Sequence, residues 1–164
     1  MPIVSALDAH PLRDGRQSPR ALSIRRGVQL MLAERRIQCL PELCLRSGRR
    51  ADLTALTEKG EIWIIEVKSS VEDFRVDKKW PDYRDYCDRL FFATLADVPA
   101  EIFPDECGFI LADAYGAEIM REAPQHALPA ARRKAMLTRF SRSAAARLFA
   151  AELAGVPIQT IDAD

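Results

Sequence analysis

An apolar run that ends in two opposite charges, Ile-Trp-Ile-Ile-Glu-Val-Lys-Ser at residues 62–69, constrains this chain more than any other stretch. A run of large apolar residues bounded by turn residues predicts a buried strand that is covered on both faces. Side chains alternate between the faces of a strand, so Glu66 and Lys68 should share one face and Val67 should point to the other. Ionisable groups at the end of a buried strand cost desolvation unless they are paired or hold a metal ion.

A second strand is predicted upstream, at residues 49–57, with a connection at residues 58–60. If the loop consists of these three residues, with Gly60 in the left-handed position of a type I turn plus bulge, Thr57 pairs with Glu61. A loop of two or four residues would shift this register by one position, which moves every side chain of the strand to the opposite face.

The three-residue loop places Asp52 opposite Glu66, so two carboxylates and the Lys68 ammonium converge on one patch of the sheet. Taken alone, Glu-x-Lys at a strand end is more often a surface ion pair than a catalytic site. An Asp followed about a dozen residues later by Glu-x-Lys, however, resembles the motif of the PD-(D/E)xK nuclease superfamily. The position of Asp52 therefore decides between the two interpretations.

The resemblance extends beyond the motif to most of the chain, from about residue 18 to residue 153. The sequences Arg-Arg-Ala-Asp-Leu at residues 49–53, Glu-Val-Lys-Ser-Ser at residues 66–70 and the long block at residues 77–93 look like the MmcB family of bacterial DNA-repair proteins. This resemblance implies an α/β fold with a restriction-endonuclease-like mixed β-sheet flanked by helices. It also implies a DNA-repair function, with Mg²⁺- or Mn²⁺-dependent hydrolysis of DNA as the expected activity.

The expected metal ligands are Asp52 and Glu66, and the resemblance implies the backbone carbonyl of Val67 as a further ligand. Lys68 would orient the attacking water or stabilise negative charge on the phosphate. Many nucleases of this fold place a further acid in the first helix. Here the only acid in that helix is Glu34, near the helix end and off its apolar stripe. We prefer Glu42 as the auxiliary ligand, because a strand beside Asp52 can aim a side chain into the same patch.

Charge is distributed unevenly, although the whole chain has a formal net charge of zero. Residues 13–50 contain ten arginines and three acidic residues, residues 51–120 contain seven basic and sixteen acidic residues, and residues 121–147 contain seven basic residues and one acid. This pattern suits an acidic centre between phosphate-binding arms, and solvated helix faces are the alternative. The candidate DNA-binding residues are Arg49, Arg50, Lys78, Lys79 and Tyr83. Trp80 and Tyr83 could stack on a base or anchor a helix to the sheet.

The remaining elements are predicted from turn and helix-capping residues and from the spacing of apolar residues. Ser18 and Pro19 predict the start of a helix that ends near residue 36, with an apolar stripe at Ile24, Val28, Met31 and Arg35, and with Arg25, Arg26 and Arg36 facing solvent. Further predictions are an edge strand at 39–45, a helix at 78–87, a parallel strand at 90–95, a hairpin of 108–112 with 117–120, and a last helix opened by Pro129 and closed by Gly155.

We expect one domain over residues 18–155, preceded by a flexible arm at 1–17 and followed by a tail at 156–164. The four cysteines show no C-x-x-C spacing and no signal peptide or membrane span is visible, so a cytoplasmic protein is expected. A homodimer is left open. Besides a nuclease, two other classes remain: a non-catalytic DNA-binding repair factor on the same fold, and an interaction module unrelated to nucleic acid.

Overall fold

The computed structural model describes residues 17–159. It divides into two compact units, one ending at Leu128 and the other beginning at Pro129, which are described separately. Residues 1–16 of the expected arm and residues 160–164 of the expected tail lie outside the described residues. The single domain expected over residues 18–155 stays a prediction.

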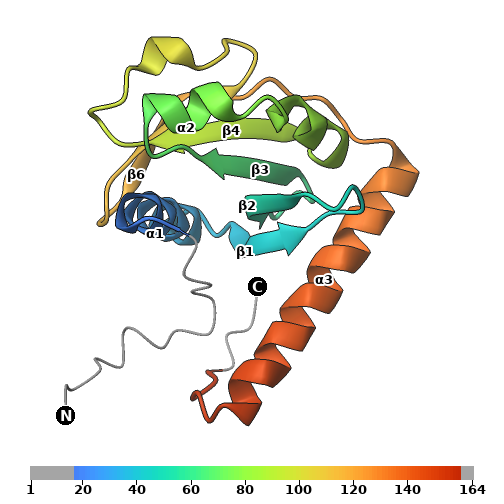
Figure 1. Cartoon of the computed structure of the whole chain (residues 1–164). Helices are drawn as coiled ribbons and strands as arrows, with labels where there is room; N and C mark the ends of the chain where they lie inside the picture. The colour runs from blue at the N-terminus through green and yellow to red at the C-terminus, as the bar shows by residue number, and fades with distance from the viewer. Residues whose placement is uncertain (1–16, 160–164) are drawn as a thin grey trace, which may run out of the picture. The chain divides into compact units, whose positions relative to one another are not determined.

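A six-stranded mixed sheet in the order β1-β2-β3-β4-β5-β6 forms the centre of the first unit (Figure 1). The pairs β3–β4 and β4–β5 are parallel, and the other neighbouring pairs are antiparallel. This arrangement confirms the predicted α/β sheet flanked by helices and the parallel crossover that follows the Glu66 strand. The strands are β1 Gln38–Cys44, β2 Arg50–Leu56, β3 Ile62–Val67, β4 Arg89–Thr94, β5 Gly108–Ala112 and β6 Ala117–Arg121.

The turn between β2 and β3 is the predicted three-residue loop. Gly60 has a φ of 81°, in the left-handed region that favours glycine. The backbone N–H of Thr57 donates to the carbonyl of Glu61 at 3.0 Å. Leu56 is then paired with Ile62, so the hairpin has the odd-numbered connection that the position of Asp52 requires.

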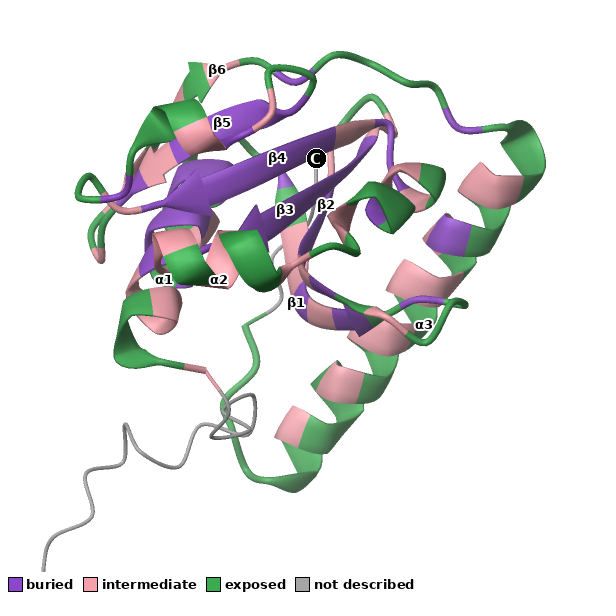
Figure 2. Ribbon diagram, turned by 45° about the horizontal axis from the view of Figure 1, so that its top comes forward, coloured by how far each residue is buried: buried purple, intermediate pink, exposed green. Residues whose placement is uncertain are grey.

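Helices cover both faces of the sheet. Helix α1, Pro19–Glu34, packs its buried Ile24 and Val28 into the same cluster as Ile65 of β3. On the other face lie α2, Val71–Val76, and the 3₁₀ helix η1, Trp80–Tyr86; a second 3₁₀ helix, η2, spans Ala100–Ile102. Phe74 of α2 and Trp80 of η1 both meet Phe92 of β4 edge-on, with ring centroids 5.3 and 5.5 Å apart. All six residues of β3 are buried between these layers (Figure 2).

Four expectations about helices need correction. Arg25 was expected to face solvent but is only 9% exposed, whereas Arg35 of the expected apolar stripe is exposed and Leu32 is buried instead. Segment 71–77, for which no helix was predicted, contains α2, which Ser70 caps. The helix expected over residues 78–87 is the shorter 3₁₀ helix η1. The spacing of apolar residues predicted a solvent-exposed Arg25 because it does not show whether solvent or another part of the protein lies beside the edge of the apolar stripe.

The second unit contains α3, Ala130–Leu153. Pro129 is its N-cap and Gly155, with a φ of 75°, follows its end, as predicted from their positions. Between residues 17 and 159, no helix combines the length and the apolar character needed to cross a membrane.

Candidate functional site

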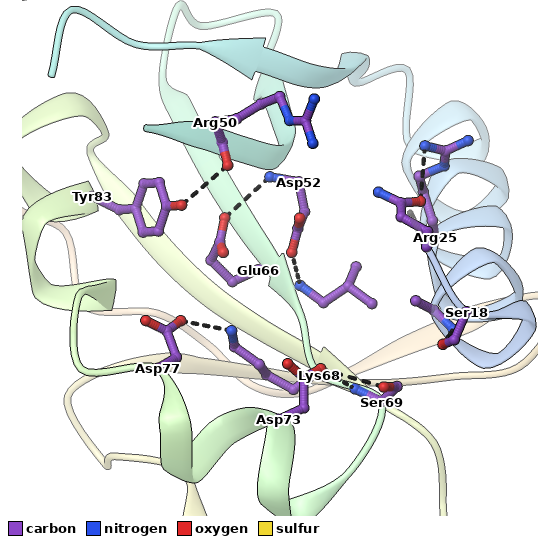
Figure 3. A pocket seen from close by; sticks show the side chains of 13 residues that line it. Ser18, Arg25, Arg50, Asp52, Glu66, Lys68, Ser69, Asp73, Asp77 and Tyr83 are labelled. Atoms are coloured by element: carbon purple, nitrogen blue, oxygen red, sulfur yellow. Dashed lines mark hydrogen bonds and ion pairs between the residues drawn. The ribbon is translucent and has the colours of Figure 1, made fainter. Parts of the chain in front are cut away.

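Strands β2 and β3 separate where the candidate acids lie. Their backbone pairing reaches Leu53 and Ile65 and stops there, one pair before Asp52 and Glu66. Beyond this point Asp52 Oδ2 accepts a hydrogen bond from the N–H of Val67 at 2.8 Å, and Glu66 Oε1 accepts one from the N–H of Asp52 at 3.1 Å (Figure 3). The carboxylates thus replace the backbone acceptors of the ladder. Asp52 and Glu66 face each other, as the three-residue loop predicted.

Burial perturbs the protonation of both acids. Glu66 is 3% exposed, and burial together with the negative charge of Asp52 raises its pKa well above the usual range for a glutamate. Burial raises the pKa of Asp52 to about 6, although the hydrogen bond from Val67 and the charge of Lys68 act in the opposite direction. The pair therefore resists holding two negative charges near neutral pH, unless a cation or a proton lies between the carboxylates.

Lys68 lies in the same pocket but is paired with an acid from another element. Its Nζ donates to Asp77 Oδ2 at 2.6 Å, and the lysine is 6% exposed. Burial opposes the charge on Lys68, but the hydrogen bond to Asp77 and the charge of Glu66 outweigh burial, so its pKa is raised. Burial likewise acts to raise the pKa of Asp77, and the Lys68 contact lowers it overall. Lys68 is thus held as a cation beside the two carboxylates.

The backbone that carries Lys68 is fixed by neighbouring groups. The Lys68 N–H donates to the carbonyl of Ala93 at 2.9 Å, and Thr94 Oγ1 donates to the Lys68 carbonyl at 2.6 Å. Ser69 then donates to Asp73 through its N–H at 2.9 Å and through its Oγ at 3.3 Å. Sequence reasoning missed the roles of Asp73 and Asp77. For Asp73 a signal existed, because Ser70 followed by acidic residues indicates the start of a helix.

On the side of the pocket away from Lys68, polar side chains from three elements are linked. Arg50 of β2 pairs with Glu42 of β1 at 2.5 Å, and Gln17 donates to the same carboxylate. The other end of the Gln17 amide accepts a hydrogen bond from Arg25 of α1 at 3.3 Å. The charge of Glu42 raises the pKa of Asp52, so Glu42 lies near the acid pair, whereas Glu34 is exposed at the end of α1. The assignment of an auxiliary ligand stays a prediction.

These groups surround one pocket of about 420 Å³. Its lining residues are Gln17, Ser18, Ala21, Arg25, Arg50, Asp52, Glu66, Val67, Lys68, Ser69, Asp73, Asp77 and Tyr83. The structure therefore brings together the three proposed catalytic residues, which come from β2 and from the end of β3.

Two of the five candidate DNA-binding residues, Arg50 and Tyr83, line this pocket. Tyr83 is buried and donates its O–H to the carbonyl of Arg50 at 3.1 Å, so it also anchors η1 to β2. Arg49, which is paired with Asp82 at 2.7 Å, lies outside the pocket lining, as do the exposed Lys78 and Lys79. Their contact with DNA stays a prediction.

Comparison with known proteins shows which family this chain belongs to. The sequence model described as "DNA repair protein MmcB-like" matches residues 8–155, which is most of the chain. The chain belongs to the MmcB-like family of DNA repair proteins. One solved structure that resembles this MmcB-like chain is the SPO1766 protein of unknown function from Silicibacter pomeroyi, with 39% sequence identity, a TM-score of 0.79, and coverage of 89% of this chain and 99% of that one. No curated protein matched in the comparison.

The acid pair can be tested as a cation site from the donors that it offers. Among residues 17–159, no group of three or more His, Cys, Asp or Glu side chains is arranged to hold a metal ion. Asp52 and Glu66, however, each accept only one hydrogen bond from the described residues, which leaves a carboxylate oxygen on each. The carbonyl of Val67 points to the same side of its strand as the N–H that reaches Asp52. Three oxygen donors fit a hard cation that keeps several waters, such as Mg²⁺.

Proposed function

We propose that the protein hydrolyses phosphodiester bonds in DNA with Mg²⁺ or Mn²⁺, as a nuclease with a PD-(D/E)xK site. The observation that carries this proposal is the separation of β2 from β3, which leaves Asp52 and Glu66 facing each other with Lys68 in the same pocket. Membership of a DNA repair family supports DNA as the substrate.

Asp52, Glu66 and the Val67 carbonyl are the groups that would hold the cation. When bound there, a divalent cation would polarise a phosphoryl oxygen and acidify a coordinated water. The raised pKa values of both carboxylates support this role, because two buried like charges are relieved by a cation between them. The two acids would therefore be fully ionised only in the loaded state.

Lys68 would stabilise the negative charge that grows on the scissile phosphate. Its ammonium is already held in the pocket by Asp77, so little reorganisation is needed when substrate arrives. Asp77 is not assigned as a metal ligand beside Asp52 and Glu66. It accepts the hydrogen bond of Lys68 and so acts as a positioning residue for that ammonium. Tyr83 holds η1 against β2 by its hydrogen bond to Arg50 and so preserves the wall of the pocket.

The direct test is cleavage of labelled single-stranded, duplex, forked and crosslinked DNA with Mg²⁺ or Mn²⁺, by the wild type and by Glu66→Ala. The proposal expects cleavage of at least one substrate that depends on the cation and is lost in the variant. Cleavage that persists in Glu66→Ala would come from another site or a contaminant and would count against the assignment.

A second candidate is a non-catalytic DNA-binding repair factor. The 2.6 Å pair between Lys68 and Asp77 favours it, because the amine is engaged with a carboxylate. This alternative expects binding without cleavage in both proteins of the same assay. It also expects that Asp52→Ala leaves the repair function in cells unchanged, whereas the nuclease proposal expects its loss.

A further inference from the structure

The start of α1 forms one side of the pocket, and its first turn contains no acidic residue. Ser18 and Ala21 line the pocket, and Ser18 Oγ caps the helix by accepting a hydrogen bond from the Ala21 N–H at 3.1 Å. The helix has 16 residues. The aligned peptide dipoles of such a helix leave about half a positive charge at its N-terminus, where an anion is favoured.

Arg25, one turn further along the same helix, lines the same pocket, and its side chain lies beside α1 (Figure 3). It is 9% exposed, so its charge is largely removed from water. Its hydrogen bond goes to the neutral amide oxygen of Gln17 at 3.3 Å, and among residues 17–159 no carboxylate forms an ion pair with it. A buried charge without a counter-charge is costly, and a guanidinium has five N–H donors to offer.

Arg25 differs from the other basic residues of the pocket, because within residues 17–159 no carboxylate forms an ion pair with it. Lys68, on the side of the pocket formed by α2, is matched by Asp77 at 2.6 Å. Arg50 is matched by Glu42. Among the described residues that line the pocket, Arg25 is a buried cation that no carboxylate pairs with. It belongs to the same helix end that carries the positive pole of the α1 dipole.

We propose that Arg25 and the N-terminus of α1 form a subsite for a DNA phosphate, distinct from the phosphate on which Asp52, Glu66 and Lys68 would act. The identity of the ligand as DNA rests on the proposed function. A planar guanidinium binds phosphate through two parallel hydrogen bonds, and a helix N-terminus adds a favourable dipole. The phosphate is either an internal phosphodiester or a monoester at a strand end, because both present the same oxygens.

The chain offers a matched pair of variants, Arg25→Gln and Arg26→Gln, because Arg26 is the exposed neighbour of Arg25 on the same helix. Binding of fluorescent single-stranded oligonucleotides is measured by anisotropy in EDTA, where no cleavage occurs, over a series of salt concentrations. Arg25→Gln should weaken binding about ten-fold and reduce the slope of log K against log salt by about 0.7, the value for one phosphate contact with a single strand. Arg26→Gln should match the wild type.

Oligonucleotides with a 5′-phosphate, a 3′-phosphate or only hydroxyl ends distinguish an internal phosphodiester from a terminal monoester as the bound phosphate. A loss in Arg25→Gln that requires a terminal phosphate identifies a monoester, and an equal loss with all three identifies an internal phosphodiester. Thermal unfolding of each variant separates lost binding from lost folding. Should Arg25→Gln not fold, Arg25→Lys carries the test: it keeps the charge but not the bidentate geometry, and an about three-fold loss of affinity is expected.

A folded Arg25→Gln, or in its place Arg25→Lys, that binds every oligonucleotide with the wild-type affinity and salt slope would overturn the subsite. Failure of the nuclease proposal looks different, because the wild type would then bind DNA with the Arg25 effect intact but cleave none of the substrates with Mg²⁺ or Mn²⁺. A wild type without salt-dependent DNA binding would overturn both.

Discussion

The two ends of β3 both carry buried or half-buried acids, but the acids are supplied with hydrogen-bond donors very differently. At the start of the strand, Asp88 is fully buried and accepts the N–H of Ile62 at 2.8 Å on one oxygen and the N–H of Leu128 at 2.9 Å on the other. At the end of the strand, Asp52 and Glu66 each accept one N–H from the described residues.

Glu61, just before β3, is another acid with several hydrogen-bond donors, and its pKa responds to them. It accepts hydrogen bonds from Trp63 at 3.0 Å, Arg89 at 3.2 Å and Gln125 at 3.1 Å. Burial acts to raise the pKa of Glu61, but the bonds from Trp63 and Arg89 lower it overall, whereas the pKa values of Asp52 and Glu66 are raised. An acid that is saturated with donors stabilises the fold. Acids that are short of donors mark the place where an outside cation or ligand should bind.

The largest effect should come from Glu66→Gln compared with Glu61→Gln. If the activity is as proposed, Glu66→Gln lowers the rate of DNA cleavage by about 10³-fold, since it removes one of the carboxylates that would hold the cation. Its free energy of unfolding at pH 7 should not fall, because burial and the charge of Asp52 already favour the neutral form of Glu66, which Gln resembles. Glu61→Gln should cleave normally but lose about 1 kcal/mol of stability. Equal effects of the two substitutions on cleavage would remove the distinction between the strand ends.

Next in size is the stability contrast between Asp88→Ala and Asp52→Ala. Asp88→Ala leaves two buried N–H groups without an acceptor and should lower the free energy of unfolding by about 3 kcal/mol. Asp52→Ala, measured by urea denaturation at pH 7 in EDTA, should lose about 1 kcal/mol or less, because the lost hydrogen bond is offset by removal of an unfavourable charge. A loss for Asp52→Ala as large as that for Asp88→Ala would show that the acid pair is structural.

The raised pKa of Asp52 predicts a dependence of stability on pH. The folded pKa is about 6 and the unfolded value is 3.8, so between these values the folded protein binds more protons than the unfolded protein. Stability in EDTA should therefore fall as the pH rises through this window, by about 2 kcal/mol relative to Asp52→Asn. Mg²⁺ should reverse the fall at neutral pH by binding the folded state. Parallel profiles for the two proteins, with no effect of Mg²⁺, would contradict the prediction.

The smallest effect is expected from Asp77→Asn, because it changes the position of Lys68 but not the acids. We expect cleavage to fall about ten-fold and the alkaline limb of the pH–rate profile to move to lower pH, since Asp77 raises the pKa of Lys68. Asp82→Asn, which breaks the exposed pair with Arg49, is the control and should change neither. A ten-fold loss without a shifted profile would assign Asp77 to packing alone.

The position of Asp52 opposite Glu66 could be predicted from local sequence. The positions of Gly60 and of the apolar run set the register of one hairpin, and register alone decides which face each side chain of a strand takes. Asp77 and Arg25 could not be predicted in this way. Arg25 borders the stripe of α1, and its neighbours along the helix do not tell whether solvent or a pocket lies beside it.

The sequence by itself determined the order and type of most elements, the β2–β3 register and the convergence of Asp52, Glu66 and Lys68, because all of these follow from turns and periodicities within about twenty residues. Only the tertiary structure decided that β2 and β3 separate at the acids, that Asp77 from beyond α2 takes Lys68, and that the start of α1 closes the other side of the pocket. These contacts join elements far apart in the chain, so they depend on how helices pack on the two faces of the sheet, which no local pattern encodes.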